Sequence, residues 1–265
     1  MAGDLSYAYA VVPFSPSLER TALAGVRGMA GSPVALVRSD DVAAAVSPVP
    51  EADFSQSALK AHLEDLDWLE RSARAHHLVV ESLAAHTTVL PLRLATVYVD
   101  DSRVVRMLQE GQPVFADSLA RLAGHAEWGV KVYVDAAAAP APPAAAPHDA
   151  PDAGRAYLRQ RRHQHQARRD AWRAAEEVVR RIDAEARDLA AGHARHRPQQ
   201  GRLAGAAPGE NVANDAYLVP HDLAEEFRRR VHHAVADAPG IRVDVTGPWA
   251  PYSFADPAAL PGAPP

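Results

Sequence analysis

Two periodicities of hydrophobic residues alternate along the N-terminal half of the chain. Segments with period two, typical of strands, occur at about 5–12 and 33–38. The apolar run 42–46 fits a helix or a strand. Further along, the pattern predicts a helix at 57–83, an extended segment at 88–99 and a helix at 100–122.

Three local signals refine these N-terminal elements. Ser55 or Ser57 can cap the helix 57–83, Pro91 indicates a bulge or an edge position, and Gly111 with Pro113 predicts a break in the helix 100–122. The apolar stripe expected on helix 57–83 consists of Leu59, Leu63, Leu66, Leu69, Ala73, His76, Val80 and Leu83.

The C-terminal half is predicted as strand, long helix, strand, helix and strand, at about 127–134, 152–192, 212–219, 220–236 and 241–245. At about 1.5 Å per residue the long helix would span roughly 55–60 Å, which predicts a partner helix in this chain or in another. Its expected seam has heptad spacing and consists of Trp172, Ala175, Val179, Ile182, Ala186 and Leu189.

Three segments lack a periodic pattern. Residues 136–151 contain fourteen Ala or Pro in sixteen positions and are expected to form an extended spacer, whereas 197–209 reads as a loop. The tail 246–265 is irregular and holds six prolines. Strands mixed with helices, without a regular βαβ repeat, predict two α+β domains.

Composition narrows the function classes. Lys and Arg total 28 against 33 Asp and Glu, so the net charge of −5 gives no overall attraction to nucleic acid or anionic lipid. Because the chain has no cysteine, disulfides, iron–sulfur clusters and cysteine nucleophiles are excluded. No apolar run reaches about 18 residues, and the start carries Asp4 rather than a basic leader, so a cytoplasmic protein is expected.

Thirteen histidines raise the question of a metal site. His76/His77 and His232/His233 are adjacent, and adjacent side chains on a helix diverge by about 100°; His163 and His165 also point apart. Surface histidines are therefore the favoured interpretation, and no metal or cofactor is predicted.

The start of the long helix is strongly basic. Between residues 155 and 173 it contains only one acidic residue, Asp170, and seven arginines. The arginines are Arg155, Arg159, Arg161, Arg162, Arg168, Arg169 and Arg173. Such a patch could meet a phosphate backbone, but only Tyr157 and Trp172 offer stacking. A solvated face or a protein contact is preferred, with nucleic-acid binding kept as the alternative function.

Catalytic signatures are not found. The chain lacks the nucleophile elbow, the phosphate-binding loop and the dinucleotide fingerprint. The acid pairs Asp40/Asp41 and Asp100/Asp101 stand where turns and helix caps already favour acids. No catalytic, cofactor-binding or metal-binding residue is assigned, and the protein is not expected to be an enzyme.

The most unusual segment is Thr246-Gly-Pro-Trp-Ala-Pro-Tyr-Ser-Phe254. Its prolines stiffen the backbone while three aromatic rings offer apolar area, so little entropy is lost when it docks. A latch onto the chain's own domains is the preferred interpretation, and a contact with another molecule is the alternative.

With these motifs in view, the chain resembles the GvpF/GvpL gas-vesicle protein family. The resemblance rests on six motifs in the family's order, reaching from Tyr7-Ala-Tyr9 to the C-terminal aromatic segment. The others are Ala216-Tyr-Leu-Val219, Gly154-Arg-Ala-Tyr-Leu158, Glu127-Trp-Gly-Val-Lys-Val132, and Val89-Leu-Pro-Leu-Arg93 after His76-x-x-Val79. Two positions depart from the family: Leu94-Ala95 replaces Phe-Gly, which puts the packing of that turn in doubt, and Ala250 replaces a proline, which is expected to loosen the tail slightly.

The resemblance also sets the expected domains. Composition alone would divide the chain at 136–151, but the family likeness places strand 127–134 in a C-terminal ferredoxin-like domain. It therefore implies domains 1–124 and 125–265, the second with a variable Ala/Pro loop at 136–151 and the tail 246–265.

Membership of that family implies an accessory or minor structural role in building gas vesicles, in the vesicle and the cytoplasm. The implied partners are the shell protein and other vesicle accessory proteins, with no membrane and no catalytic activity. A small-molecule enzyme on a ferredoxin-like scaffold remains a third hypothesis, because that scaffold hosts many chemistries.

Overall fold

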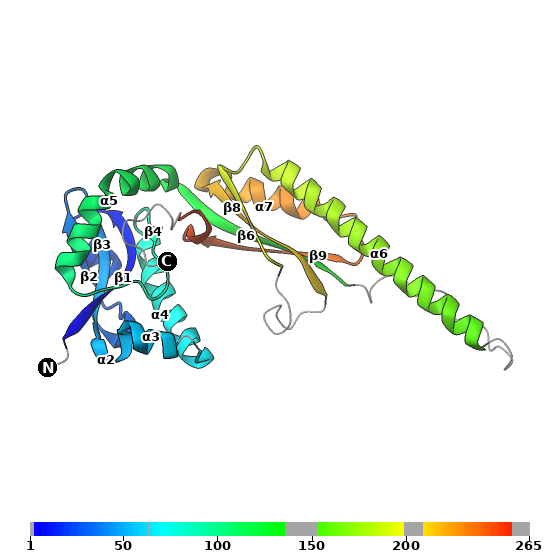
Figure 1. Cartoon of the computed structure of the whole chain (residues 1–265). Coiled ribbons are helices and arrows are strands. Elements are labelled where there is room, and N and C mark those ends of the chain that lie inside the picture. Colours follow the sequence, from blue (N-terminus) through cyan, green and yellow to red (C-terminus); the bar gives the residue numbers. More distant parts are fainter. Residues whose placement is uncertain (1–2, 63, 136–152, 199–208, 256–265) are drawn as a thin grey trace. The chain divides into compact units, whose positions relative to one another are not determined.

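A computed structural model of the chain describes residues 3–62, 64–135, 153–198 and 209–255, without the side chains of 153–160 and Gln164. It divides into two compact units: unit 1 comprises Met1–Ala126 with Trp249–Pro265, and unit 2 comprises Glu127–Pro248 (Figure 1). The predicted division at 124/125 differs mainly at the C-terminus, because Trp249 and the residues after it group with unit 1.

Unit 1 is built on one sheet of five strands. These are β1 (Asp4–Pro13), β2 (Ala35–Ser39), β3 (Val42–Pro50), β4 (Leu90–Pro91) and β5 (Val97–Tyr98). Their order is β2-β3-β1-β4, with β5 also paired to β1. The ambiguous run 42–46 is therefore a strand, and the predicted segment 88–99 forms two short strands separated by a turn, with Pro91 in the first.

In its described residues, unit 1 also has six helical segments before residue 126 and a 3-10 turn at Tyr252–Phe254. The six segments are α1 (Leu18–Ala22), a 3-10 turn (Met29–Gly31), α2 (Glu51–Phe54), α3 (Gln56–His62), α4 (Leu66–Ala84) and α5 (Asp101–Leu122). The single helix predicted at 57–83 is wrong: Asp65 caps a new helix by accepting from the amides of Asp67 and Trp68. The stripe shifts accordingly, since Leu66 is 76% exposed and the buried residues of α4 are Ser72, His76, Val79, Val80 and Leu83.

Helix α5 is continuous through Pro113, so the predicted break at Gly111 and Pro113 is wrong. Its buried face runs through both halves and consists of Val104, Met107, Leu108, Gly111, Phe115, Ser118, Leu119 and Leu122. Packing of that face on either side of the proline holds the axis despite the missing amide donor. Asp100 caps the helix through the amide of Arg103 at 2.9 Å, as its sequence position predicted.

The core of unit 1 lies on β1. All residues from Tyr7 to Val12 are fully buried, because two helices pack against the sheet: α4 contacts β1, and α5 contacts β1, β2 and β3. The strand predicted at about 5–12 is confirmed, and both of its faces are buried. Packed against β1 are Leu18, Met29, Val49, Phe54, Val79, Val80, Leu83 and Val89.

In its described residues, unit 2 has a four-stranded sheet, two α-helices and a 3-10 turn. Its elements are β6 (His125–Val134), α6 (Ala153–Ala186), β7 (Gly192–His196), β8 (Glu210–Pro220), a 3-10 turn (His221–Leu223), α7 (Ala224–His233) and β9 (Ile241–Trp249). The strand order is β7-β8-β6-β9. Helices α6 and α7 pack against each other, and both contact β8. Helices and sheets in both units confirm the α+β class.

Three predictions for unit 2 need correction. Strand β7 was not predicted, because Gly-His-Ala-Arg-His lacks an apolar alternation, and α6 ends at Ala186 instead of 192. Strand β9 continues to Trp249, so the irregular tail begins later than 246. The Ala/Pro segment 136–151, most of the loop 197–209 and the end of the tail, 256–265, lie outside the described residues.

The core of unit 2 joins β6, β8, α6 and α7. Buried residues on the two strands are Trp128, Val130, Val132, Tyr217 and Val219, and those on the helices are Val178, Ile182, Ala186, Phe227 and Val231. Ala175, Ile182, Ala186 and Leu189 of the predicted α6 seam are buried, whereas Trp172 and Val179 are only half-buried. These two residues face a hollow in the surface.

Candidate interaction surfaces

The C-terminal segment Trp249–Phe254 docks on α4 within unit 1. The amide of Ala250 donates to Glu81 Oε1 at 3.1 Å, and the Tyr252 hydroxyl lies 3.4 Å from His77 Nδ1. The rings of Trp249 and Tyr252 lie 5.8 and 6.0 Å from the ring of His77. These contacts are those of the predicted intramolecular latch, although Trp249 remains 42% exposed.

The core histidine under this segment is His76. Its Nδ1 lies 2.9 Å from the Tyr7 hydroxyl, and its ring contacts the rings of Tyr7, Tyr9 and Tyr252. Burial lowers the pKa of His76 to about 4, although the nearby Leu92 carbonyl acts in the opposite direction. Burial likewise raises the pKa of Tyr7 far above its usual value. Both side chains are therefore neutral at pH 7.

The other histidine pairs do not converge. His77 is partly exposed beside Tyr252, and the side chains of His163, His165, His232 and His233 are exposed on α6 and α7. Within the described ranges, no three His, Asp or Glu side chains form a cluster that could hold a metal ion. The surface interpretation of the histidines is therefore wrong for His76, which is buried in unit 1.

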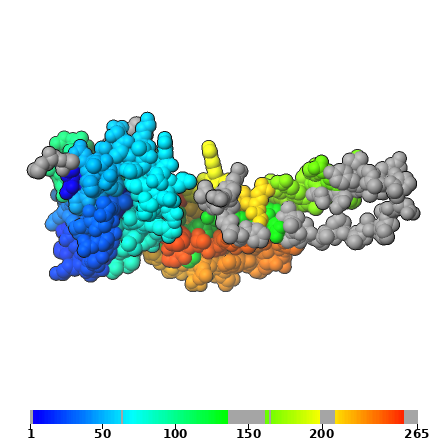
Figure 2. Space-filling view, turned by 90° about the horizontal axis from the view of Figure 1, so that it is seen from below, coloured from blue at the N-terminus to red at the C-terminus, as the bar shows by residue number. Residues whose placement is uncertain are grey.

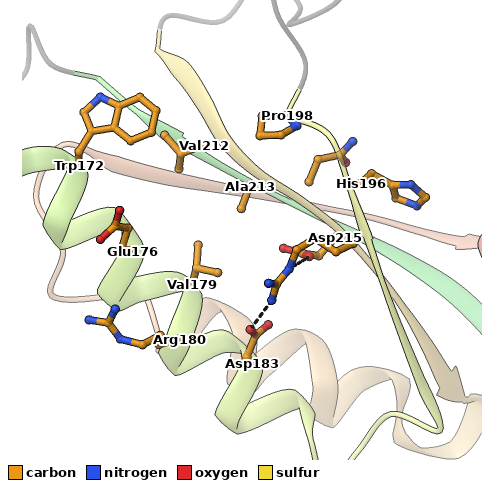
Figure 3. A pocket seen from close by; sticks show the side chains of 12 residues that line it. Trp172, Glu176, Val179, Arg180, Asp183, His196, Pro198, Val212, Ala213 and Asp215 are labelled. Carbon is orange, nitrogen blue, oxygen red and sulfur yellow. Dashed lines mark hydrogen bonds and ion pairs between the residues drawn. The ribbon is translucent and has the colours of Figure 1, made fainter.

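Unit 2 carries an open hollow of about 420 Å³ between α6 and the strands β7 and β8 (Figure 3). Its apolar lining comes from Trp172 and Val179 on α6 and from Val212 and Ala213 on β8. Charged side chains surround these residues: Glu176, Arg180, Asp183, Arg195 and Asp215. The hollow is shallow and partly apolar, and therefore suits a side chain or helix of another polypeptide.

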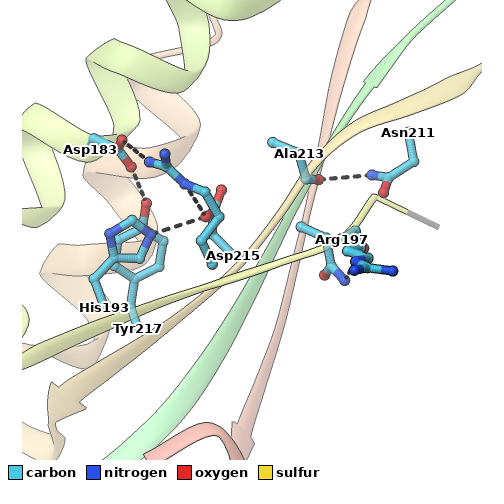
Figure 4. A network of polar contacts seen from close by, with 9 residues as sticks. Asp183, His193, Arg197, Asn211, Ala213, Asp215 and Tyr217 are labelled. Carbon is cyan, nitrogen blue, oxygen red and sulfur yellow. Dashed lines mark hydrogen bonds and ion pairs between the residues drawn. The ribbon is translucent and has the colours of Figure 1, made fainter.

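A polar network closes one end of the hollow (Figure 4). Arg195 donates to Asp183 at 3.1 Å and lies 3.4 Å from Asp215, whose carboxylate also lies 3.0 Å from His193 Nε2. Tyr217 donates to Asp183 at 2.6 Å, and burial together with this carboxylate raises its pKa far above the usual value.

The members of this network are thus already paired with one another. The Asp215 side chain is only 4% exposed, and the rings of His193 and Tyr217 stack at 4.6 Å. Such pairing satisfies buried polar groups and fixes β7 and β8 to α6. No pattern in the sequence predicted this network; its one signal is Asp215, a charge directly before the apolar run Ala216–Val219.

The arginines predicted as a basic patch lie on the N-terminal half of α6. Arg161, Arg162, Arg168, Arg169 and Arg173 are exposed, whereas the side chains of Arg155, Tyr157 and Arg159 lie outside the described part. Arg168 pairs with Glu210 at 3.1 Å and Arg173 with Asp170 at 3.4 Å. This segment forms a second hollow, of about 560 Å³, with Trp172 and Glu176 at its end.

The acid pairs occupy structural positions. Asp40, with φ of 50°, lies in the turn between β2 and β3, and Asp41 accepts the amide of Phe14 through its carbonyl. Asp100 caps α5, and Asp101 accepts a 2.6 Å hydrogen bond from Ser6. The structure therefore uses these residues in turns and caps.

Comparison with known proteins gives a consistent result over nearly the whole chain. A family model described as "Gas vesicle synthesis protein GvpL/GvpF" matches residues 5–256. The chain is 46% identical over 255 residues to gas vesicle protein L of Streptomyces sp. (strain CB03234), covering 95% of this chain and 92% of that protein. It is 24% identical over 222 residues to gas vesicle protein F2 of Halobacterium salinarum (strain ATCC 700922 / JCM 11081 / NRC-1), covering 82% and 84%.

Solved structures share the fold. The crystal structure of GvpF from Anabaena sp. PCC7120 has a TM-score of 0.66 at 20% identity, with 96% of each chain covered. GvpF from Microcystis aeruginosa has a TM-score of 0.64 at 18% identity, covering 95% of this chain and 99% of that one. At these identities the likeness concerns the fold alone.

Proposed function

Because the chain belongs to the gas vesicle synthesis protein GvpL/GvpF family, we propose that it is an accessory or minor structural protein of gas vesicles. It acts through contacts with the vesicle shell protein and with other vesicle proteins. The observation that carries this proposal is the extent of the family match, since residues 5–256 span both units and include the aromatic segment.

The surface chemistry supports a role based on contacts. Asp183, Asp215 and Arg195 at the unit 2 hollow are engaged with one another, and His76 is held neutral inside a core. Groups tied in this way maintain a shape, whereas the half-buried Trp172 and Val179 offer apolar area. We therefore propose that the protein binds polypeptides and is not an enzyme.

We further propose that unit 2 is a ferredoxin-like domain. Its β-α-β-β-α-β element order and the strand order β7-β8-β6-β9 support this assignment, as does the packing of both helices against β8. The fold by itself decides no chemistry, so the function rests on the family and on the surfaces.

The proposed location is the gas vesicle and the surrounding cytoplasm. Among the helices of the described residues, none combines the length and the apolar character needed to span a bilayer. Nucleic-acid binding, the alternative drawn from the arginines, receives no support from the names of the relatives.

The proposal can be tested with the full chain, purified with an affinity tag and incubated with the gas vesicle shell protein of the same host. We expect the shell protein to be retained, and we expect Trp249→Ala to weaken retention or folding, since the exposed ring contacts His77. Circular dichroism and thermal unfolding separate the two effects. Failure of the intact chain to retain the shell protein or any other vesicle protein would contradict the proposal.

A further inference from the structure

We propose that the outer face of α6 binds an acidic amphipathic helix of another polypeptide. The face, called here the α6 strip, consists of Arg168, Arg169, Trp172, Arg173, Glu176 and Val179. The inference deepens the proposed function, on which it rests for its biological meaning, by naming a surface and the chemistry of its partner.

The first support is that none of the described side chains between Arg161 and Asp170 of α6 is buried. Residues 161–163 and 165–170 are all exposed, and full burial begins at Ala175. In the cartoon, α6 extends past the ends of the strands of unit 2 (Figure 1). In the space-filling view, the green residues of α6 reach past the orange residues of α7 (Figure 2). A helix polar on all sides gains little from its own packing, so a binding partner would stabilise this segment.

The second support is that two hollows meet on the α6 strip. The hollow with the apolar lining and the hollow among the arginines share Trp172 and Glu176. The apolar and basic parts are therefore continuous along one side of α6. From Arg168 to Val179 they extend about 17 Å at 1.5 Å per residue, a length that matches about three turns of a docked helix.

The third support is the charge and residue type of the α6 strip. The α6 strip contains three arginines and one acidic residue, Glu176, so its net charge is positive. Tryptophan and arginine are the residue types that dominate binding energy in protein interfaces. The ion pairs Arg168–Glu210 and Arg173–Asp170 are exposed and contribute little, so their arginines can exchange to carboxylates of a partner. Complementarity therefore selects a partner helix with Asp or Glu beside its apolar stripe.

Two other occupants fit less well. The phosphates of a nucleic acid would contact the arginines but would leave the apolar part of the strip, Trp172 and Val179, without a partner. A second copy that offered the same strip would place its arginines against the arginines of the first, and like charges repel.

The test uses the full chain and a designed helical peptide of about 18 residues as the probe, labelled for fluorescence anisotropy. Its leucines recur every three or four residues, and glutamates flank them. A peptide with the same composition in shuffled order is the first control. We expect the helical probe to bind at least about tenfold more tightly than the shuffled peptide, with an affinity that falls as salt rises.

Charge reversal locates the site. R169E/R173E should weaken binding of the probe about tenfold or more, because both residues line the basic hollow. W172A should weaken it through lost apolar contact. The matched control, R103E/R106E, changes two exposed arginines of α5 and should leave binding within about twofold. Arg and Glu have similar helix propensities, so R169E/R173E should preserve the circular dichroism spectrum.

Four results would overturn the inference. They are equal binding of the shuffled peptide, full binding by R169E/R173E, tighter binding of duplex DNA than of the probe at the same salt, and a dimer in analytical ultracentrifugation that R169E/R173E dissociates. None of these readouts uses a vesicle protein. If the chain retains the shell protein but does not bind the probe, only the proposal on the α6 strip is disproved. If the chain binds the probe but retains no vesicle protein, the proposed function is disproved.

Discussion

The backbone amide of Ala250 donates a hydrogen bond to the carboxylate of Glu81 at 3.1 Å, and Ala250 is only 2% exposed. Alanine at this position, where the related family usually has proline, was expected to loosen the tail. The contact shows a different consequence. Proline has no amide hydrogen, so only a residue such as alanine can make this bond. The substitution fixes the aromatic segment to α4 by a polar contact.

Ala250→Pro and Glu81→Ala are therefore expected to be energetically coupled. Proline removes the hydrogen bond, which lowers the free energy of unfolding by about 1 kcal/mol for a partly exposed carboxylate. It also restricts the unfolded chain, which raises the free energy of unfolding by about 0.4–1 kcal/mol. In a protein that already carries Glu81→Ala, Ala250→Pro has no hydrogen bond to remove. Urea unfolding of the four proteins in a double-mutant cycle should give a coupling free energy of about 1 kcal/mol. Strictly additive effects would show that the amide–carboxylate contact does not stabilise the fold.

Ala95 adopts a left-handed conformation, with φ of 64°, in the turn between β4 and β5. Its amide donates to the Tyr7 hydroxyl at 3.0 Å, which holds the turn against β1. The left-handed region costs about 1 kcal/mol or more for alanine and little for glycine, the residue that the family usually has here.

Ala95→Gly is thus expected to raise the free energy of unfolding by up to about 1 kcal/mol, after allowing for the larger entropy of glycine in the unfolded chain. The matched control is Ala73→Gly on the exposed side of α4, which should lower it by about 1 kcal/mol. Chemical denaturation measures both. Equal destabilisation by the two substitutions would mean that the turn does not strain Ala95.

Ala250 and Ala95 illustrate which features of the fold can be predicted from the sequence and which cannot. Periodicity identified most strands and helices, because a buried face leaves a regular trace of apolar residues. It failed where local contacts decide: Asp65 starts a new helix, and α5 runs through Pro113 because its apolar face packs on both sides. The first outcome depends on a capping side chain, which apolar periodicity does not register, and the second depends on packing against strands that are distant in the sequence.

The candidate surfaces show the same limit. The aromatic segment and the arginines of α6 stood out in the sequence by their residue types, and the structure gives their places. The hollow beside Trp172 did not stand out, because Val212 and Ala213 come from a strand about forty residues further along the chain. The pairing of Asp215 with His193 likewise depends on the β7–β8 register, in a strand that the pattern missed.

His76 predicts a pH dependence of stability. Its pKa is about 4 in the folded protein against an ordinary value of 6.5, so the unfolded chain binds this proton more readily. The contribution to stability is therefore complete above about pH 6.5 and is lost as the pH falls toward 4. From pH 7 to pH 5 this histidine alone should lower the free energy of unfolding by about 2 kcal/mol.

His76→Phe should remove this part of the pH dependence, whatever its effect on stability at pH 7. His77→Phe, which changes the neighbouring and partly exposed histidine, should retain it. Denaturant titrations of the three proteins at pH 7, 6 and 5 supply the comparison. A native profile that His76→Phe leaves unchanged would place the titrating group elsewhere.

Tyr217 connects β8 to α6 through the 2.6 Å hydrogen bond to Asp183. Tyr217→Phe keeps the ring that stacks on His193 and removes only the hydroxyl. The half-buried carboxylate of Asp183 then keeps its hydrogen bond from Arg195 but loses the one from the tyrosine. A hydrogen bond to a charged acceptor contributes about 1.5–3 kcal/mol, so the free energy of unfolding should fall by about that amount. Tyr98→Phe, at a half-buried tyrosine of unit 1, is the control and should change it by less than about 0.5 kcal/mol. If both substitutions have the same small effect in urea unfolding, the network does not hold α6 to the sheet.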